Sequence, residues 1–522
     1  MASLNIPAVP EGVYIGLGIL LFNFVIWLFR NFREINNRSK LPPGPSPWPV
    51  LGNLHLLGSL PHRTLTNLAK KYGPVMFLRL GSVPTVVVSS SAMAKEFLKT
   101  QDLVFANRPN GATGKLLCYD RKDVGFAPYG EYWRQMKKLC TVELLTAKRS
   151  NSFQFVREEE VSAMICSIWK ESERGSRCVD LRKSISSLTL NIACRMFASR
   201  TYSDHELSGG HGFKTMIDDM FAVAGAFDLG DFIPWLQRLD LQGIRRRMKK
   251  VHRLYDEFAE NVIDEHMSSR RKVSAEKRDQ GGPVKDFVDV LLDMAEGKTE
   301  GTGMKITRVH IKAIILDVLN AGTETSSTTI AWAMSELLKN PRSLSRAREE
   351  LASVVGRDRS VKERDIASCE YLRCVVKETF RLHPPLPFLI PHESTEGCRV
   401  GGYYVPTKTR LIVNAWAIGR DGSVWEGPEE FKPERFIGKN IDVRGQDFEL
   451  LPFGTGRRVC PGIWMGLSTV ELGLAQLLHC FDWSVEGDVN MGEFFGLTVP
   501  RKFPLLARPK WRLTTEDIVD KS

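Results

Sequence analysis

The stretch that decides the fold runs Phe453-Gly454-Thr455-Gly456-Arg457-Arg458-Val459-Cys460-Pro461-Gly462. Glycine and proline each destabilise a helix interior, so this stretch predicts a shaped loop that presents Cys460. The two arginines supply positive charge that favours a thiolate, and the glycines let the backbone approach a bulky partner closely. The pattern therefore predicts a thiolate ligand beside a large planar cofactor. The alternative is that Cys460 is simply a buried free cysteine, as many free cysteines are.

Five positions of this loop resemble the haem-ligand signature of the cytochrome P-450 family. They are Phe453, Gly456, Arg458, Cys460 and Gly462. The resemblance implies that the thiolate of Cys460 is the axial ligand of the iron in haem b (iron protoporphyrin IX), and that the other four residues belong to the cofactor-binding set. It also implies a mostly α-helical fold with a small β part, an α-rich triangular prism with a minor β-sheet region.

The composition is that of a folded globular chain, with 43% hydrophobic and 25% charged residues among 522. No linker divides the globular part, so we expect one catalytic domain over residues 54–522 despite the length. The net charge of +11 suits an anionic membrane or an acidic protein partner. Nucleic acid is disfavoured because no basic stripe is interleaved with stacking aromatics.

The cysteines lack CxxC pairs, which indicates reduced thiols and no zinc site.

The N-terminal segment, residues 1–30, is predicted to be a membrane anchor. The run from Val13 to Phe29 is uncharged and, at about 1.5 Å per residue, long enough for a thin bilayer. Basic residues follow this run and none precedes it, so the catalytic domain is expected on the cytosolic side. A cleaved signal peptide is the alternative, but it would carry a basic start and a small-residue cleavage site. We expect a single-pass protein of the endoplasmic reticulum membrane.

A basic and proline-rich hinge, residues 31–53, is predicted to follow the anchor. The run from Leu41 to Pro49 is rich in proline, which fixes φ and removes N–H donors. It therefore predicts a stiff extended strut between membrane and body. A ligand for an SH3-type domain is the alternative.

The remaining chain is mainly helical in its period of apolar residues. Val75 to Leu80 and Val83 to Ser89 flank Gly81-Ser82 and predict a hairpin, and a further strand is expected at Thr409 to Val413. Helices are expected at Glu158 to Lys170, Arg245 to His266, Phe287 to Met294, His310 to Lys339, Arg342 to Val355 and Leu467 to Leu478. Ser269 to Pro283 is charged and predicts a surface loop.

The run Asp231-Phe232-Ile233-Pro234-Trp235-Leu236 is apolar and precedes the basic run from Arg245 to Lys250. Such a pairing suits a lipid surface. A core turn followed by a solvated helix face explains the pattern equally well.

Inside the long apolar helix lies Ala321-Gly322-Thr323-Glu324-Thr325-Ser326. Glycine, hydroxyls and an acid cost helix stability there, and hydroxyls can bond back to the carbonyl four residues earlier. A kinked buried helix is one explanation. The segment also resembles the oxygen-activation motif of the family, which implies Thr325 and Glu324 as catalytic residues that supply protons for O–O cleavage.

The resemblance assigns further residues to the haem propionates, namely Trp133, Lys137, His392 and Arg458. Trp133 and Lys137 stand one helical turn apart and so can address the same acid. Lysine stands where the family often has arginine, so bidentate capture is lost. A second implied set, Glu378, Arg381 and Arg435, would form a buried charge network that fixes the cysteine loop and is structural, not catalytic.

Together the motifs resemble the plant microsomal A-type members and imply a monooxygenase that inserts one oxygen atom of O2 into a small lipophilic metabolite. Electrons would come from NADPH through a membrane-bound flavoprotein reductase, whose acidic face would meet Arg134, Lys137, Lys138 and Arg457. Five segments are expected to face the substrate: Gly111 to Phe126, Phe213 to Asp231, Ala313 to Gly322, Leu386 to Ile390 and Phe494 to Leu497.

The later substrate-facing segments are apolar, which favours a terpenoid, with a phenolic such as a flavonoid as the alternative. Two rival functions are a haem-thiolate isomerase or dehydratase and a non-enzymatic haem-binding protein. Thr325 argues against both, because neither needs a proton relay.

Overall fold

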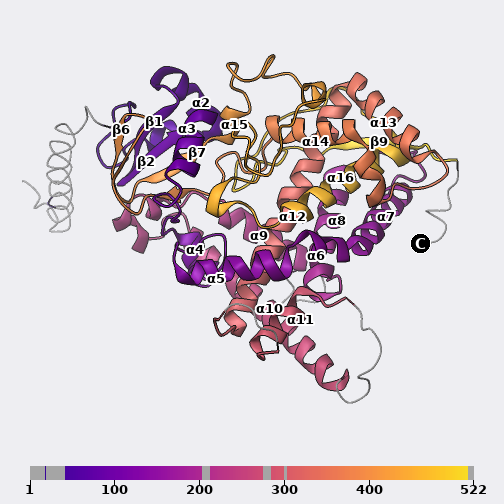
Figure 1. Cartoon of the computed structure of the whole chain (residues 1–522), viewed down its shortest axis with the longest axis horizontal. Coiled ribbons are helices and arrows are strands. Elements are labelled where there is room, and N and C mark those ends of the chain that lie inside the picture. The colour runs from indigo at the N-terminus through magenta and orange to yellow at the C-terminus, as the bar shows by residue number, and fades with distance from the viewer. Residues whose placement is uncertain (1–17, 19–40, 203–211, 274–283, 299–302, 515–522) are drawn as a thin grey trace, which may run out of the picture.

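The computed structural model describes residues 18, 41–202, 212–273, 284–298 and 303–514. Strands β1, β2, β6 and β7 gather at one end of the molecule beside α2, α3 and α15, and the longer helices fill the other end (Figure 1). The described part is thus mostly helical with small sheets, as the sequence predicts. The predicted anchor lies almost entirely outside the described residues. Within the ranges just given, no helix is both long and apolar enough to span a bilayer.

Helices make up most of the described chain. The α-helices are α2 (Pro61–Tyr72), α3 (Ser91–Lys95), α4 (Ala112–Leu116), α5 (Glu131–Leu139), α6 (Ala147–Ser152), α7 (Gln154–Glu171), α8 (Leu181–Ala198), α9 (Phe213–Ala224), α10 (Ile244–Val273), α11 (Phe287–Ala295), α12 (Arg308–Lys339), α13 (Pro341–Val355), α14 (Glu370–Leu382), α15 (Ala415–Ile418) and α16 (Ile463–Cys480). Each of the six predicted helices is present, with ends shifted by a few residues.

The strands form small sheets at the rim of the helical body. They are β1 (Val75–Leu80), β2 (Val83–Val88), β3 (Val179–Asp180), β4 (His392–Glu393), β5 (Cys398–Val400), β6 (Tyr403–Val405), β7 (Arg410–Val413), β8 (Phe481–Ser484) and β9 (Leu506–Trp511). The largest sheet has the order β1-β2-β7-β4. The predicted hairpin is its antiparallel β1-β2 pair, and β7 adds to β2 in parallel.

Helix α12 is the central element of the helical body. It packs against α8, α14 and α16, and most of its apolar residues are buried. A capping box between Thr307 and His310 starts the helix, because each residue satisfies an otherwise free backbone N–H. Asn340 ends it directly before Pro341, which begins α13 at the first helical position, where proline is tolerated.

Two sequence predictions about loops need correction. The surface loop expected over Ser269 to Pro283 is wrong for its first five residues, because α10 continues to Val273, and the rest of it lies outside the described residues. Arginine and lysine are good helix formers, and Arg270 in this last turn donates to Asp289 over 3.0 Å. The proline-rich run is non-helical as expected, but it lies along β1 and does not stand clear of the body, since the amide N–H of Phe77 donates to the carbonyl of Pro43 over 2.9 Å.

The apolar run before α10 is divided between core and surface. Phe232 and Ile233 are buried in a cluster with strands β1 and β2, whereas the side chain of Trp235 is 53% exposed. Phe232 and Ile233 therefore fit the core turn offered by the sequence, while contact of the exposed Trp235 with lipid stays a prediction.

Candidate active site around Cys460

The cysteine loop is a tight turn that leads into α16. The amide N–H of Cys460 donates to the carbonyl of Phe453 over 2.9 Å and closes the loop. Gly454 and Gly456 adopt φ of 67° and 65°, which side chains rarely tolerate. A Cβ on Gly456 would lie 2.7 Å from the carbonyl oxygen of Leu98. The loop therefore requires glycine at this position to approach its neighbours.

Burial raises the pKa of the Cys460 thiol above its usual value, while the amide of Gly462 and the ammonium of Lys137 act in the opposite direction. The Nζ atom of Lys137 donates to the carbonyl of Val459, next to the cysteine. The arginines expected to favour the thiolate have other partners. Arg457 pairs with Asp102, with 2.9 Å between Nε and Oδ2. Lys137 takes the role that the sequence assigns to the arginines, because its helix runs past the loop.

Arg458 turns away from the sulfur and lies over the indole ring of Trp133, with 4.1 Å from its guanidinium carbon to the ring centroid. Its Nε donates to the carbonyl of Ala106 over 2.8 Å. The indole Nε1 of Trp133 donates to the carbonyl of Val124 over 3.1 Å. The structure thus brings Trp133, Lys137 and Arg458 to one side of the cysteine loop.

A second buried guanidinium joins this group. Arg108 is 4% exposed, and its Nη1 donates to the carbonyl of Ile390 over 2.5 Å. The Nδ1 atom of His392 lies 2.8 Å from the carbonyl oxygen of Phe105. Sequence reasoning did not assign Arg108 a role. The sequence feature that could have drawn attention to Arg108 is the run Phe105-Ala106-Asn107-Arg108-Pro109, in which an arginine stands directly before a proline in a loop.

Cations outnumber anions in this cluster. Burial lowers the pKa of Arg108, and the neighbouring Arg458 lowers it further. Burial also lowers the pKa of Arg458 to about 10. Among the described residues, Asp123 is the carboxylate that opposes both shifts, and burial raises its own pKa to about 6. A buried and a half-buried guanidinium opposed by this one carboxylate form a site suited to carboxylates from outside the chain.

The predicted charge network is present on α14. Arg381 donates to both carboxylate oxygens of Glu378, over 2.7 and 2.8 Å, and Arg435 donates to the same carboxylate over 3.0 Å. Arg381 also donates to the carbonyl of Gly419 over 2.6 Å. The network therefore holds the segment that precedes the cysteine loop. Contact with the loop itself comes from Phe380, whose ring meets that of Phe453 edge-on at 5.3 Å.

Glu324 and Thr325 lie in the middle of α12, which continues as a regular helix through this point. The hydroxyl of Thr325 donates to the carbonyl of Ala321 over 2.5 Å, so it bonds back along the helix as anticipated. Ala321 is exposed although it stands between buried turns of the helix. Burial raises the pKa of Glu324 to about 7, against the opposing effect of Arg182.

A cavity of about 1030 Å³ borders Glu324. Four of the five segments expected to face the substrate line it, including Phe388–Ile390 and Phe494–Leu497. The fifth expected segment, Ala313 to Gly322, does not line the cavity, and the next turns of the same helix do. Helix α12 lines the cavity with Glu324, Ser327, Thr328 and Ala331, not with Ala313 to Gly322. The wall also holds charged residues that the sequence did not assign to it: Asp180, Arg182, Lys183, Arg410 and Arg501.

Comparison with known proteins decides the family. The profile of the family described as cytochrome P-450 matches residues 42–505. This chain belongs to the cytochrome P-450 family. It is 51% identical over 507 residues to cytochrome P-450 750A1 of Pinus taeda, with 95% of each chain covered. It is 41% identical over 510 residues to a flavonoid 3'-monooxygenase of Arabidopsis thaliana, covering 95% of this chain and 97% of the relative.

The structure has the fold of the family as well. A zebrafish cytochrome P-450 solved with abiraterone superposes with a TM-score of 0.71 at 28% identity, covering 87% of this chain and all of the other. This cytochrome P-450 is therefore an oxidoreductase of the monooxygenase class, and the family carries haem. The surplus of buried cations next to a free cysteine fits that cofactor, whose edge bears two carboxylates.

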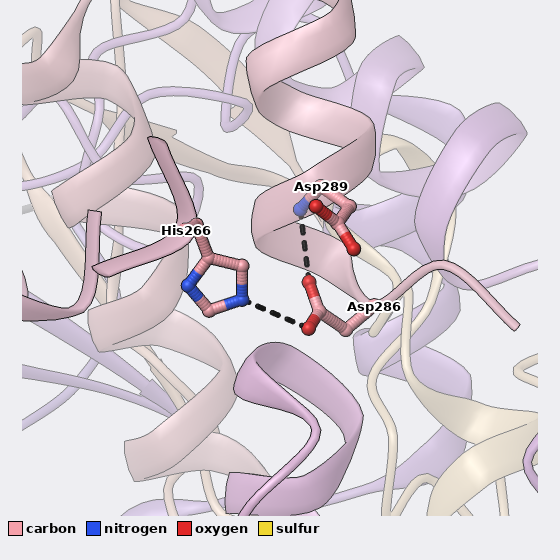
Figure 2. Close-up of side chains that lie close together, drawn as sticks. All are labelled: His266, Asp286 and Asp289. Carbon is pink, nitrogen blue, oxygen red and sulfur yellow. Dashed lines mark hydrogen bonds and ion pairs between the residues drawn. The ribbon is translucent and has the colours of Figure 1, made fainter. Parts of the chain in front are cut away.

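A separate cluster resembles a metal site in its composition. His266, Asp286 and Asp289 meet where α10 and α11 pack together (Figure 2). The Nδ1 atom of His266 lies 2.7 Å from the carbonyl oxygen of Val262, and its Nε2 lies 2.9 Å from Oδ2 of Asp286. Because both ring nitrogens face acceptors, both carry protons and neither is left to bind a metal. The cluster is an ion pair that caps α11 through Asp286.

Proposed function

We propose that this cytochrome P-450 hydroxylates a small lipophilic plant specialised metabolite, with Cys460 as the axial ligand of haem iron. The observation that carries the proposal is the position of Cys460 beside the half-buried Lys137, which belongs to the same cationic cluster as the buried Arg108 and the half-buried Arg458. Burial raises the pKa of the thiols of Cys118, Cys140 and Cys480 as it does that of Cys460, and Lys137 acts on Cys140 too, so the glycine-containing loop is what distinguishes Cys460 from them.

The haem propionates would be held by Arg108, Arg458 and Lys137, with Trp133 and His392 beside them. Each of these cations at present donates to backbone carbonyls, which are weaker acceptors than carboxylates. When bound, the haem would supply activation of O2 and insertion of one oxygen atom into a C–H bond. The loop glycines would leave room for its plane against Phe453.

Glu324 and Thr325 would supply the protons of the reaction. A carboxyl group with a pKa of about 7 is partly protonated at cytosolic pH, so Glu324 can both hold and release a proton. Its place on the cavity wall gives it access to solvent. Thr325 is not among the residues that line the cavity, and its hydroxyl would have to leave the carbonyl of Ala321 to take part in the relay. This relay favours a monooxygenase over the isomerase, dehydratase and non-enzymatic alternatives.

Two features move the expected substrate class toward the phenolics. The sequence favours a terpenoid because the presumed lining offers few hydrogen-bonding groups. The cavity wall, however, includes Arg182, Arg410, Thr498 and other polar residues. Two relatives that are 41% and 39% identical to this chain are named flavonoid 3'-monooxygenases. We therefore place a phenolic first and a terpenoid second.

Electrons would come from NADPH through a flavoprotein reductase at the endoplasmic reticulum membrane. Fewer of the basic residues expected to meet the reductase are free to do so in the structure. Lys137 binds the carbonyl of Val459 and Arg457 pairs with Asp102, so neither is a free surface cation. Lys138 remains exposed on α5, as does Arg134, which pairs with Glu131.

The test is turnover in microsomes that contain the full chain and a plant reductase. A panel of phenolics and terpenoids is supplied with NADPH and O2, and oxygenated products are identified by mass spectrometry with ¹⁸O2. Product that depends on NADPH, carries label from O2 and arises from a phenolic supports the proposal. Rearranged product without NADPH would indicate an isomerase. Haem binding without any product across the panel would favour the non-enzymatic alternative.

A further inference from the structure

Arg410 is a charged residue on the cavity wall that no step proposed above uses. It begins β7, opposite Thr85 of β2 and Glu393 of β4. Side chains alternate along a strand, so Arg410 shares a face with Ile412, which packs into the cluster that contains Phe232. The guanidinium lies over the ring of Phe232, 4.7 Å from its centroid, and borders the cavity.

The guanidinium of Arg410 lacks a polar partner among the described residues. Its buried Nε makes no hydrogen bond, and no carboxylate of the described ranges lies within ion-pair distance. The nearest acids are engaged by other groups. Asp231 accepts from Arg245 over 2.8 Å and from the amide of Ala112 over 2.9 Å. Glu393 accepts from Asn107 over 3.0 Å.

The other arginines of the cavity wall differ in this respect. Arg182 donates to the carbonyl of Arg501 over 3.2 Å. Arg501 itself donates to the hydroxyl of Ser335 over 2.6 Å and to the carbonyl of Asn490 over 2.8 Å. The Nε of Arg501 is likewise buried without a partner, but its two Nη atoms are bonded. Arg410 is thus the guanidinium of this wall, within the described residues, for which no hydrogen bond is found.

Arg410 is half-buried, but its Nε is fully buried without an acceptor. That is costly, and a guanidinium does not lose its proton under ordinary conditions. Burial lowers the pKa of Arg410, while Asp231 and Glu393 oppose that shift from a distance. The ring of Phe232 offers only its face, which attracts the cation but accepts none of its in-plane N–H groups. An oxygen ligand in the cavity would satisfy them.

We propose that Arg410 binds an ionised oxygen of the substrate, a carboxylate or a phenolate, and thereby fixes the end of the substrate that is not oxidised. The inference rests on the proposed function, because it takes the cavity to be the substrate site. It narrows that function to substrates with an acidic oxygen at one end and an apolar body. The planar fork of arginine suits such an oxygen in a bidentate contact.

The rival explanation is a structural clamp in which Arg410 only holds Phe232, and with it the segment before α10, against the sheet. The two explanations predict different effects of replacing Arg410 on the binding of acidic and neutral ligands. Loss of a clamp weakens binding of acidic and neutral ligands alike. Loss of an oxygen-binding group weakens binding of the acidic ligand alone.

The experiment measures binding, not turnover, so it gives a result even if the proposed reaction is wrong. Full-length haem-loaded enzyme in nanodiscs is titrated by calorimetry with two matched ligand pairs. One pair is p-coumaric acid and its methyl ester, and the other is 7-hydroxyflavone and 7-methoxyflavone above the pH at which the phenol ionises. The variants are Arg410→Gln, Arg410→Lys and Lys439→Gln. The last removes one positive charge from an exposed residue that does not line the cavity.

We expect the wild type to bind the acidic member of at least one pair about 10- to 100-fold more tightly than the neutral member, the range for charge-assisted hydrogen bonds. Arg410→Gln abolishes the preference, Arg410→Lys keeps part of it, and Lys439→Gln leaves it unchanged. The ligand pair whose acidic member binds more tightly shows whether Arg410 binds a carboxylate or a phenolate. The proposal is overturned if the wild type prefers neither acid, or if Arg410→Gln weakens both members equally. Unchanged thermal midpoints exclude misfolding as the cause.

Discussion

The carboxylate of Glu493 lies 2.9 Å from Nε2 of His62, although the two residues are 431 positions apart in the chain. Both side chains are almost fully buried, and Arg63 donates to the same carboxylate oxygen over 2.7 Å. Glu493 immediately precedes Phe494–Thr498, which line the cavity. Helix α2 therefore fixes the base of a cavity-lining segment from the far end of the sequence.

We expect Glu493→Gln to loosen this segment and to affect substrate binding more than the chemical step. Burial raises the pKa of Glu493, but the hydrogen bonds from His62 and Arg63 prevail and lower it to about 2. Glutamine keeps one acceptor but loses the charge, so KM rises several-fold while kcat changes less. Steady-state kinetics on the product identified above tests this. Glu486→Gln, which removes an exposed carboxylate, serves as the control, and an equal effect there would contradict the account.

Glu378→Gln is expected to be among the most damaging substitutions outside the cysteine loop. It leaves the buried guanidiniums of Arg381 and Arg435 without their shared carboxylate, which costs roughly 3–5 kcal/mol. Thermal unfolding and the yield of haem-containing protein measure the loss. Glu173→Gln breaks an exposed pair with Arg177 and should change stability by less than about 0.5 kcal/mol. Similar midpoints for the two variants would show that the network contributes little.

The proposed proton relay through Glu324 and Thr325 predicts how tightly product formation is coupled to NADPH consumption. With a pKa of about 7, Glu324 is mainly protonated at pH 6 and mainly ionised at pH 8, so its capacity to donate falls across this range. The ratio of product to NADPH consumed should fall over the same range in the wild type. Glu324→Gln should give a flat profile, and Thr325→Ala should raise peroxide at the expense of product at every pH. Unchanged coupling in Thr325→Ala would remove that hydroxyl from the relay.

The pair of His266 and Asp286 predicts how the thermal stability of the protein depends on pH. Burial lowers the pKa of His266, but the hydrogen bonds to Asp286 and Val262 outweigh it and hold the pKa above its usual value. A raised pKa in the folded state means that the pair stabilises the protein fully below the unfolded pKa of about 6.5 and that this is lost as the pH rises through the folded pKa. His266→Gln should therefore lower the thermal midpoint most at pH 6 and progressively less toward pH 9. A difference that grows with pH would contradict the ion pair.

Local patterns in the sequence predict much of the fold and part of the site. The two apolar and β-branched runs around Gly81-Ser82 predict the β1-β2 hairpin, and the long apolar period predicts α12, because both depend on neighbouring residues. The loop that presents Cys460 follows from its glycines and proline. These features need no knowledge of distant contacts.

The features that the sequence could not predict all depend on distant contacts. Arg457 is expected to act on Cys460, three positions later in the sequence, but it pairs with Asp102, 355 positions earlier in the chain. Lys137 lies beside the sulfur because α5 runs past the loop, which its own sequence does not encode. The period of a strand puts Arg410 and Ile412 on one face but does not say that this face meets a cavity.

The central claim is that Cys460 ligates the haem iron, and the spectrum of the reduced protein with CO tests it most directly. The wild type should show the red-shifted Soret band typical of thiolate ligation. Cys460→His, which keeps a ligand at this position, should bind haem and lose that band, whereas Cys178→Ala, at a half-buried cysteine far along the chain, should retain it. A thiolate band that persists in Cys460→His would show that another residue holds the iron and would contradict the account.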